Sequence, residues 1–215
     1  MKLLAFEMST RHASIALLGG DAPPVEETWE ESRAHYETLF QAVTRLLDRA
    51  GASLKDIDVF AVGRGPGSFS GVRVALTAAR AFALPFGRTV YPVSSGEALA
   101  FDILKQHSGA TVAVVGDARR GMLWLGSFRR GDGVPACVTP WTLVPVNRLA
   151  GRLAGIDFAV SSEWDRLRPI AGDYTDCDHG SAFPTARAVG ELVAAKLSRN
   201  LPADPPEPLY LHPAV

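Results

Sequence analysis

The sequence contains few cysteines and no excess of charge of either sign. Its two cysteines, Cys137 and Cys177, lie too far apart for a metal or redox motif, which fits a reducing compartment. The formal net charge of −1 excludes an overall positive field that would attract nucleic acid. No apolar run reaches the length of a membrane span, and the N-terminus meets Glu7 too early for a signal peptide. We therefore expect a cytoplasmic protein with no membrane partner.

The sequence also lacks the spacing of the common metal and nucleophile sites. None of its histidines forms a His-x-x-x-His pair. They are His12, His35, His107, His179 and His212. Asp176-Cys-Asp-His179 is a dense group of donor side chains, but a solvated loop explains it better. Ser68 does not stand in a Gly-x-Ser-x-Gly nucleophile motif, because Ser70 occupies the position of the second glycine. We predict no metal site and no catalytic residue, and we disfavour a peptidase.

The most distinctive stretch, residues 59–84, combines an apolar strand, a glycine-rich turn and an alanine-rich helix. The turn contains Gly63, Gly65, Gly67, Ser68 and Gly71. It is not a P-loop, because no lysine lies between Lys55 and Lys105. It is not a dinucleotide-binding fingerprint either, because a serine occupies the third glycine position. The structural interpretation is a tight strand-to-helix turn that only glycine can make.

The helix predicted over residues 72–84 is apolar except for one narrow stripe. Arg73, Thr77 and Arg80 form this stripe at positions i, i+4 and i+7. A helix this apolar should be covered on two sides. The chain's own sheet supplies one cover, and either a second helix or a partner protein supplies the other. A longer helix is predicted from Tyr36 to Ala50, with Leu39 and Phe40 among its apolar positions.

Two segments of the chain repeat the order strand, loop, strand, turn, strand. They are residues 2–31 and 111–138, and Asp117 in the second stands where Glu7 stands in the first. The pattern predicts an α/β fold of two lobes, each a mixed sheet with flanking helices. We expect a first lobe over 1–104 and a smaller, compact second lobe over 105–198. The proline-rich tail, 199–215, should pack back on the first lobe.

Three stretches together resemble the TsaB (YeaZ) family of the actin-like, sugar-kinase and heat-shock ATPase superfamily. They are Leu4-Ala-Phe-Glu-Met-Ser-Thr10, Ala61-Val-Gly-Arg-Gly-Pro-Gly-Ser-Phe-Ser-Gly-Val-Arg73 and Val115-Gly-Asp-Ala-Arg-Arg-Gly121. The resemblance implies a two-lobed actin-like ATPase (ribonuclease H-like) fold. It implies a non-catalytic partner protein in bacterial synthesis of threonylcarbamoyladenosine in ANN-decoding tRNAs.

The same resemblance implies partners and cofactors. TsaD carries the metal and the transfer chemistry, and the ATPase TsaE also takes part; alone, the chain is expected to form a homodimer. The chain itself should require no cofactor, with ATP or ADP possible at its interface with TsaD. We expect a partner interface on the first-lobe helices. Its residues are Phe69, Val72, Arg73, Leu76, Thr77, Arg80, Glu37, Gln41, Thr44 and Arg45.

The sequence departs from the family pattern in two places. Glu7 replaces the usual aspartate of the first loop, which disfavours nucleotide hydrolysis by the chain itself, and His212 replaces a tail arginine. We interpret four residues as vestigial nucleotide loops: Glu7, Ser9, Thr10 and Asp117. An ATP-dependent small-molecule kinase or ATPase of the same superfamily is the alternative function. Contact with tRNA should be weak or indirect, through Arg119-Arg120 and Arg129-Arg130 at the two ends of one hairpin.

Overall fold

The computed structural model describes residues 1–20, 23–30, 35–171 and 178–211, with the backbone alone described at 35–37, 168–171 and 178–179. The chain divides into two compact units. The first comprises Met1–Ala98 and Pro184–Leu209, and the second comprises Leu99–Phe183 and Tyr210–Val215. Among the described residues, no helix combines the length and apolarity that crossing a membrane requires. Glu37 has no described side chain, and Cys177 and His212 lie outside the described residues.

The first unit is built on a mixed sheet with the strand order β3-β2-β1-β4-β5. Its first three strands pair antiparallel, and β1, β4 and β5 pair parallel. The strands are β1 (Leu3–Glu7), β2 (His12–Leu18), β3 (Val25–Glu30), β4 (Val59–Gly63) and β5 (Thr89–Val93). The helices of this unit are α1 (His35–Ala50), α2 (Phe69–Ala83) and α6 (Ala186–Leu197), with short 3₁₀ turns η1 (Leu54–Asp56) and η2 (Leu84–Phe86). Helix α3 (Ser95–Gln106) begins in the first unit and continues into the second.

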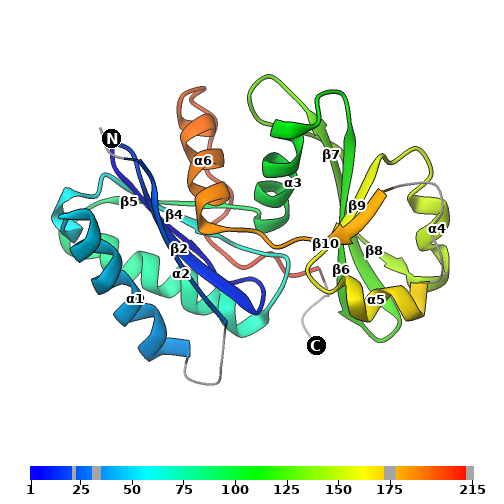
Figure 1. The fold of residues 1–215 in the computed structure, drawn as a ribbon, viewed down its shortest axis with the longest axis horizontal. Coiled ribbons are helices and arrows are strands. Elements are labelled where there is room, and N and C mark those ends of the chain that lie inside the picture. Colours follow the sequence, from blue (N-terminus) through cyan, green and yellow to red (C-terminus); the bar gives the residue numbers. More distant parts are fainter. Residues whose placement is uncertain (21–22, 31–34, 172–177, 212–215) are drawn as a thin grey trace. The chain divides into compact units, whose positions relative to one another are not determined.

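Helices cover both faces of this first sheet. Leu4 and Phe6 point to the face that carries α1 and α2 and belong to their common core. Because successive residues of a strand face opposite sides of the sheet, Ala5 points to the other face. Gly190 of α6 lies against Ala5 there. Figure 1 shows α1 and α2 on one side of the strands and α6 on the other.

The second unit repeats the first topology. Its strand order is β10-β9-β6-β7-β8, which matches the first sheet strand for strand when β6 takes the place of β1. The antiparallel and parallel pairings also correspond. The elements are β6 (Thr111–Arg119), β7 (Met122–Arg130), β8 (Pro135–Pro145), η3 (Val146–Arg148), α4 (Leu149–Arg152), β9 (Phe158–Ser161), α5 (Trp164–Ala171) and β10 (Asp178–Ser181). The predicted fold class and the repeated architecture are confirmed.

The predicted lobe boundaries are wrong at two helices. Leu99 and Leu104 of α3 are buried in a core with strands β6 and β7, so residues 99–104 belong to the second unit. Helix α6 belongs to the first unit, where the backbone N–H of Ala186 donates to Ser14 Oγ on β2 at 2.8 Å. Helix α3 therefore packs on the second sheet and α6 on the first. The local sequence of a helix does not specify which sheet its apolar face will contact. Of the tail expected over 199–215, the residues up to Leu209 belong to the first unit, whereas Tyr210 and Leu211 belong to the second.

One predicted loop is a strand. Asp178 and His179, part of the donor group Asp176-Cys-Asp-His179, begin β10, which pairs in parallel with β9. The strand is only four residues long, and its pairing partner lies elsewhere in the sequence, so local pattern gives no signal for it. The side chains of this group lie outside the described residues.

Candidate functional site

The glycine turn is shaped by close approach to the loop between β1 and β2. A Cβ atom on Gly71 would lie 2.0 Å from the carbonyl oxygen of Met8, and one on Gly67 would lie 2.2 Å from that of Ser9. A Cβ on Gly63 would lie 1.9 Å from Oε2 of Glu7. No side chain fits at these distances, so glycine allows β4 and α2 to pack directly on the first loop.

The polar backbone groups of the turn bind the chain's own first unit. The N–H of Gly65 donates to Ser95 Oγ at 3.0 Å, and the N–H of Ser95 donates back to the Gly65 carbonyl at 2.8 Å. The N–H of Ser68 donates to the Ser9 carbonyl at 2.6 Å. Gly65 itself has φ of +91°, a conformation that favours glycine. These bonds support the structural interpretation of the turn over a phosphate cradle.

Helix α2 begins directly after this turn and has one buried and one exposed face. Ser68 caps it, because its Oγ accepts the N–H of Gly71 at 3.2 Å. Val72 and Leu76 are each 3% exposed and lie in the core with α1 and the sheet. The expectation that these two residues supply apolar contact to a partner is therefore wrong. Their spacing places them on the sheet side of the helix.

The exposed face of α2 carries a stripe of five residues that ends in η2. They are Phe69, Arg73, Thr77, Arg80 and Leu84, all exposed. The Arg73 guanidinium lies 4.9 Å from the centre of the Phe69 ring, a cation–π contact. Phe69 is 58% exposed and Leu84 is 81% exposed. Large apolar side chains at both ends of a solvent-facing stripe are typical of a protein-binding surface.

Helix α1 has one exposed aromatic residue among its predicted apolar positions. Phe40 is 49% exposed, and its ring meets that of Phe82 on α2 edge to face, with 5.4 Å between ring centres. Phe40 belongs to the apolar pattern of α1. That pattern alone cannot distinguish residues at the exposed edge of the apolar side from residues at its buried centre. We call the exposed stripe of Phe69, Arg73, Thr77, Arg80 and Leu84 the α1–α2 face, after the helix layer that carries it.

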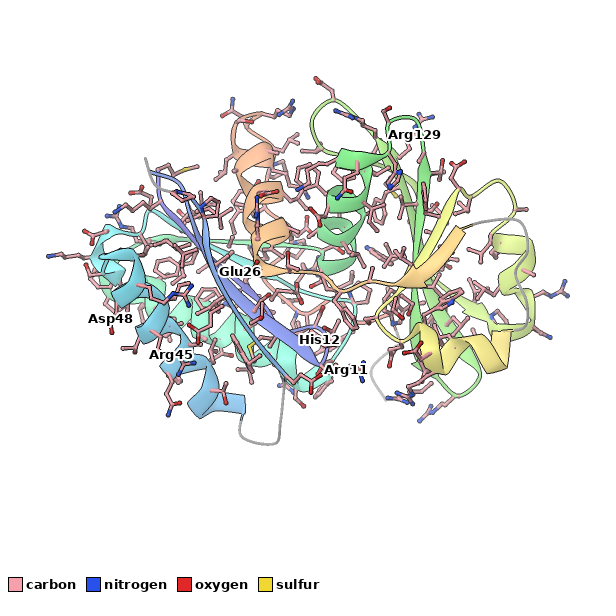
Figure 2. The ribbon with its side chains drawn as sticks, in the orientation of Figure 1. Arg11, His12, Glu26, Arg45, Asp48 and Arg129 are labelled. Carbon is pink, nitrogen blue, oxygen red and sulfur yellow. The ribbon has the colours of Figure 1, made fainter. Side chains whose placement is uncertain are left out.

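The remaining expected interface residues of α1 lie outside this group. Arg45 donates two hydrogen bonds to Glu27 on β3, the edge strand opposite β5, so it faces away from α2. Figure 2 shows Arg45 and Asp48 on this helix. Gln41 and Thr44 are exposed, and Thr44 Oγ1 donates to the Phe40 carbonyl at 3.1 Å. The Glu37 side chain lies outside the described residues.

The first of the expected nucleotide loops is closed by its own neighbours. Glu7 ends β1 and is fully buried, and its Oε1 accepts the N–H of Ser9 at 2.6 Å. Burial raises the pKa of the Glu7 carboxyl group, and the Ser9 and Ser95 hydroxyl groups beside it partly oppose that rise. Thr10 Oγ1 accepts the N–H of His12 at 3.2 Å within the loop. A carboxyl group enclosed in this way does not fit the hydrated magnesium ion of a nucleotide complex.

The second expected loop is occupied by ion pairs. Asp117 accepts from the backbone N–H of Arg119 at 2.7 Å and from its Nη1 at 2.9 Å. The N–H of Asp117 donates to Glu163 Oε2 at 3.1 Å. The described residues contain no group of three His, Cys, Asp or Glu side chains placed to hold a metal ion. Neither loop therefore offers a set of ligands from which a catalytic step can be derived.

The four arginines expected to form a basic edge lie at opposite ends of a hairpin. Arg119 ends β6 and Arg120 lies in the turn to β7, whereas Arg129 and Arg130 end β7. Eight residue steps along a strand separate the two ends by about 27 Å. They do not form one patch, and Arg119 is already paired with Asp117.

Sequence reasoning missed a buried group of charges in the first unit. Lys196 on α6 is 8% exposed, and its Nζ lies 3.0 Å from Glu97 Oε2 and 3.7 Å from Asp204 Oδ1. Arg64 Nη1 lies 3.8 Å from Asp204 Oδ2. Burial raises the pKa of Glu97, and Lys196 opposes that rise. One signal was present, because Lys196 follows Val189, Leu192 and Val193 at the spacing of a buried helix face.

Comparison with known families and proteins places this arrangement in a recognised group. The family model described as "TsaD: tRNA N6-adenosine threonylcarbamoyltransferase" matches residues 8–156. The tRNA threonylcarbamoyladenosine biosynthesis protein TsaB of Haemophilus influenzae is 32% identical over 131 residues, which cover 60% of this chain and 55% of that protein. The TsaB protein of Bacillus subtilis is 31% identical over 140 residues, covering 65% and 60% respectively. The chain thus matches little more than half the length of these curated relatives.

A solved structure matches over nearly the whole chain. YeaZ from Pseudomonas aeruginosa superposes with a TM-score of 0.82 at 27% sequence identity, covering 98% of this chain and 99% of that one. The match therefore includes the later half of the chain, where the sequence motifs resemble the family least.

Proposed function

Since the chain belongs to the TsaB (YeaZ) family of the actin-like ATPase superfamily, we propose that it is a non-catalytic partner protein in bacterial tRNA threonylcarbamoyladenosine biosynthesis. It binds TsaD through the α1–α2 face and supports transfer of the threonylcarbamoyl group to ANN-decoding tRNAs. The observation that carries this proposal is the stripe of exposed apolar and arginine side chains along α2. Aromatic residues and arginine are the side chains that most often dominate binding energy at protein interfaces.

The remaining parts of the proposal follow from this role. TsaD supplies the metal and the transfer chemistry, TsaE takes part as the ATPase, and the chain requires no cofactor of its own. The site for ATP or ADP is at the interface with TsaD. The isolated chain forms a homodimer through the same face and acts in the cytoplasm, with weak or indirect contact to tRNA. The enclosed carboxyl group of Glu7 supports the non-catalytic assignment.

Two matched substitutions that each add a negative charge test the binding face. Ala81→Glu adds a charge and four heavy atoms at an exposed position of α2, between Thr77 and Leu84. Ala150→Glu makes the same change at an exposed position of α4 in the second unit. We expect Ala81→Glu to weaken binding of TsaD from the same organism by about tenfold or more, as for a residue near an interface centre. Ala79 is not a suitable site for this test, because it is fully buried and a charge there would destabilise the fold instead of altering the binding surface.

Titration calorimetry and size-exclusion chromatography with purified TsaD provide the measurement. Equal affinity of the wild type and both variants would remove α2 from the interface. Reconstitution of tRNA modification with and without the chain tests the wider role. Binding of magnesium-ATP by the isolated chain would instead favour the alternative function, a small-molecule kinase or ATPase.

A further inference from the structure

The segment from Leu201 to Leu209 follows a defined path along the first unit. It contains no helix or strand, yet two of its backbone N–H groups are bonded to distant elements. The N–H of Asp204 donates to the Pro92 carbonyl of β5 at 3.1 Å, and that of Leu209 donates to the Arg64 carbonyl at 2.8 Å. Because β5 is an edge strand, the segment runs from the end of α6 across this edge to the glycine turn.

Side chains from three elements hold the carbonyl groups of the same segment. The Tyr91 hydroxyl on β5 donates to the Leu201 carbonyl. Arg64 Nε in the glycine turn donates to the Glu207 carbonyl at 2.8 Å. Arg80 on α2 donates to the Pro206 carbonyl, so the segment reaches the α1–α2 face. Four prolines restrict the segment before it docks and lower the conformational entropy lost on docking.

The buried group of charges fixes the middle of the segment. The carboxylate of Asp204 lies between Lys196 and Arg64, whose side chains are 10% and 11% exposed. Lys196 also pairs with Glu97 of α3. Charges removed from water in this way need their partners, so loss of the Asp204 charge should release the segment and not merely weaken a surface contact.

We propose that residues 201–209 act as a strap that positions Arg80 and the C-terminal half of α2 for the partner protein, with Arg64 and Asp204 as positioning residues. The inference rests on the proposed function. An arginine held in place before binding loses less side-chain entropy when the partner docks on it. The exposed residues Pro205, Pro206 and Glu207 lie beside Arg80 and extend the face that the partner meets.

Hydrogen exchange of the isolated full-length chain tests whether the strap is held as described. Asp204→Asn keeps the shape of the side chain and removes its charge. We expect the amides of residues 204 and 209 to exchange about tenfold faster or more in this variant, because their bonds to β5 and the glycine turn open. Asp165→Asn, an exposed carboxylate on α5, is the matched control and should leave both amides unchanged. Unchanged exchange in Asp204→Asn would overturn the strap.

Binding of TsaD by the same variants tests the positioning role. We expect Asp204→Asn to raise the Kd by about five- to tenfold while Asp165→Asn leaves it unchanged. Arg80→Met keeps the apolar stem, removes the bond to Pro206 and serves as a second variant should Asp204→Asn not fold. If Asp204→Asn and Arg80→Met bind TsaD as tightly as the wild type despite faster exchange, the positioning role is wrong and the proposed function still stands. If the wild type does not bind TsaD, the proposed function fails and the positioning role falls with it.

Discussion

The two units share one strand topology but differ in the helices that cover it. In the first unit, α1 and α2 have 16 and 15 residues, whereas the corresponding α4 and α5 of the second have four and eight. Among the side chains that the structure describes, α2 with the adjoining η2 carries an exposed stripe with large apolar side chains at both ends, and α4 and α5 carry no exposed large apolar side chain. The repeated sheet therefore specifies the fold, and the helix layer of one repeat carries the candidate binding surface.

The two acidic residues at corresponding positions show the same divergence. Glu7 is fully buried at the end of β1 and accepts a bond from its own loop. Asp117 near the end of β6 is only half-buried and pairs with Arg119 on the surface. Equivalent places in a repeated topology thus provide an enclosed acid in one unit and a surface ion pair in the other.

The largest expected difference between the units lies in their glycines. Gly71→Ala places a Cβ 2.0 Å from the Met8 carbonyl oxygen, so α2 or the first loop must move. We expect a loss of about 2–4 kcal/mol of stability. Gly151→Ala on α4 meets no atom within 4 Å and should stabilise by about 0.5–1 kcal/mol through helix propensity. Urea denaturation of both variants provides the measurement, and a small loss in Gly71→Ala would show that the turn can relax.

The second prediction concerns the two acids and has a defined pH dependence. The folded pKa of Glu7 is raised, so its contribution to stability is complete below the ordinary value of 4.5 and is lost as pH rises through the folded pKa. Glu7→Gln should remove this loss and stabilise the protein above that range by about 1–3 kcal/mol, the usual cost of an incompletely compensated buried polar group. Asp117→Asn breaks an exposed ion pair and should destabilise by less than about 1 kcal/mol.

Denaturation at pH 5 and pH 8 separates these expectations. The gain in stability of Glu7→Gln over the wild type should be larger at pH 8 than at pH 5. A gain independent of pH would mean that Glu7 does not change its protonation between these values. Destabilisation at both values would mean that the buried site requires the carboxyl group itself and rejects an amide.

The sequence predicts the sheets better than it predicts the surface. Apolar runs and turn residues predict the three-stranded meanders, and the glycine spacing predicts the turn before α2, because these signals are local. The assignment of α6 depends on which sheet its apolar face meets, and that choice is made by tertiary packing. Lys196 illustrates the limit, since its buried partners Glu97 and Asp204 lie on other elements.

The sequence predicts the polar stripe of α2 but not the apolar residues that are exposed beside it. Helical spacing places Arg73, Thr77 and Arg80 on one stripe, and all three are exposed. The same spacing could not separate Val72 and Leu76, which are buried, from Phe69 and Phe40, which are not. Apolar residues occur on both the core and the interface side of a helix, so hydrophobicity alone cannot distinguish the two.

The smallest expected effects come from the two ends of the β6–β7 hairpin. Arg120 has φ of +55°, a left-handed conformation that glycine adopts more easily, so Arg120→Gly should stabilise by about 0.5–1 kcal/mol. Arg130→Gly also removes an exposed arginine, from the end of β7, and should destabilise by a similar amount, because glycine weakens a strand. Thermal unfolding of the pair measures both shifts. Opposite signs for one substitution at two ends of one hairpin would attribute the difference to backbone conformation, whereas equal signs would show that loss of arginine charge dominates.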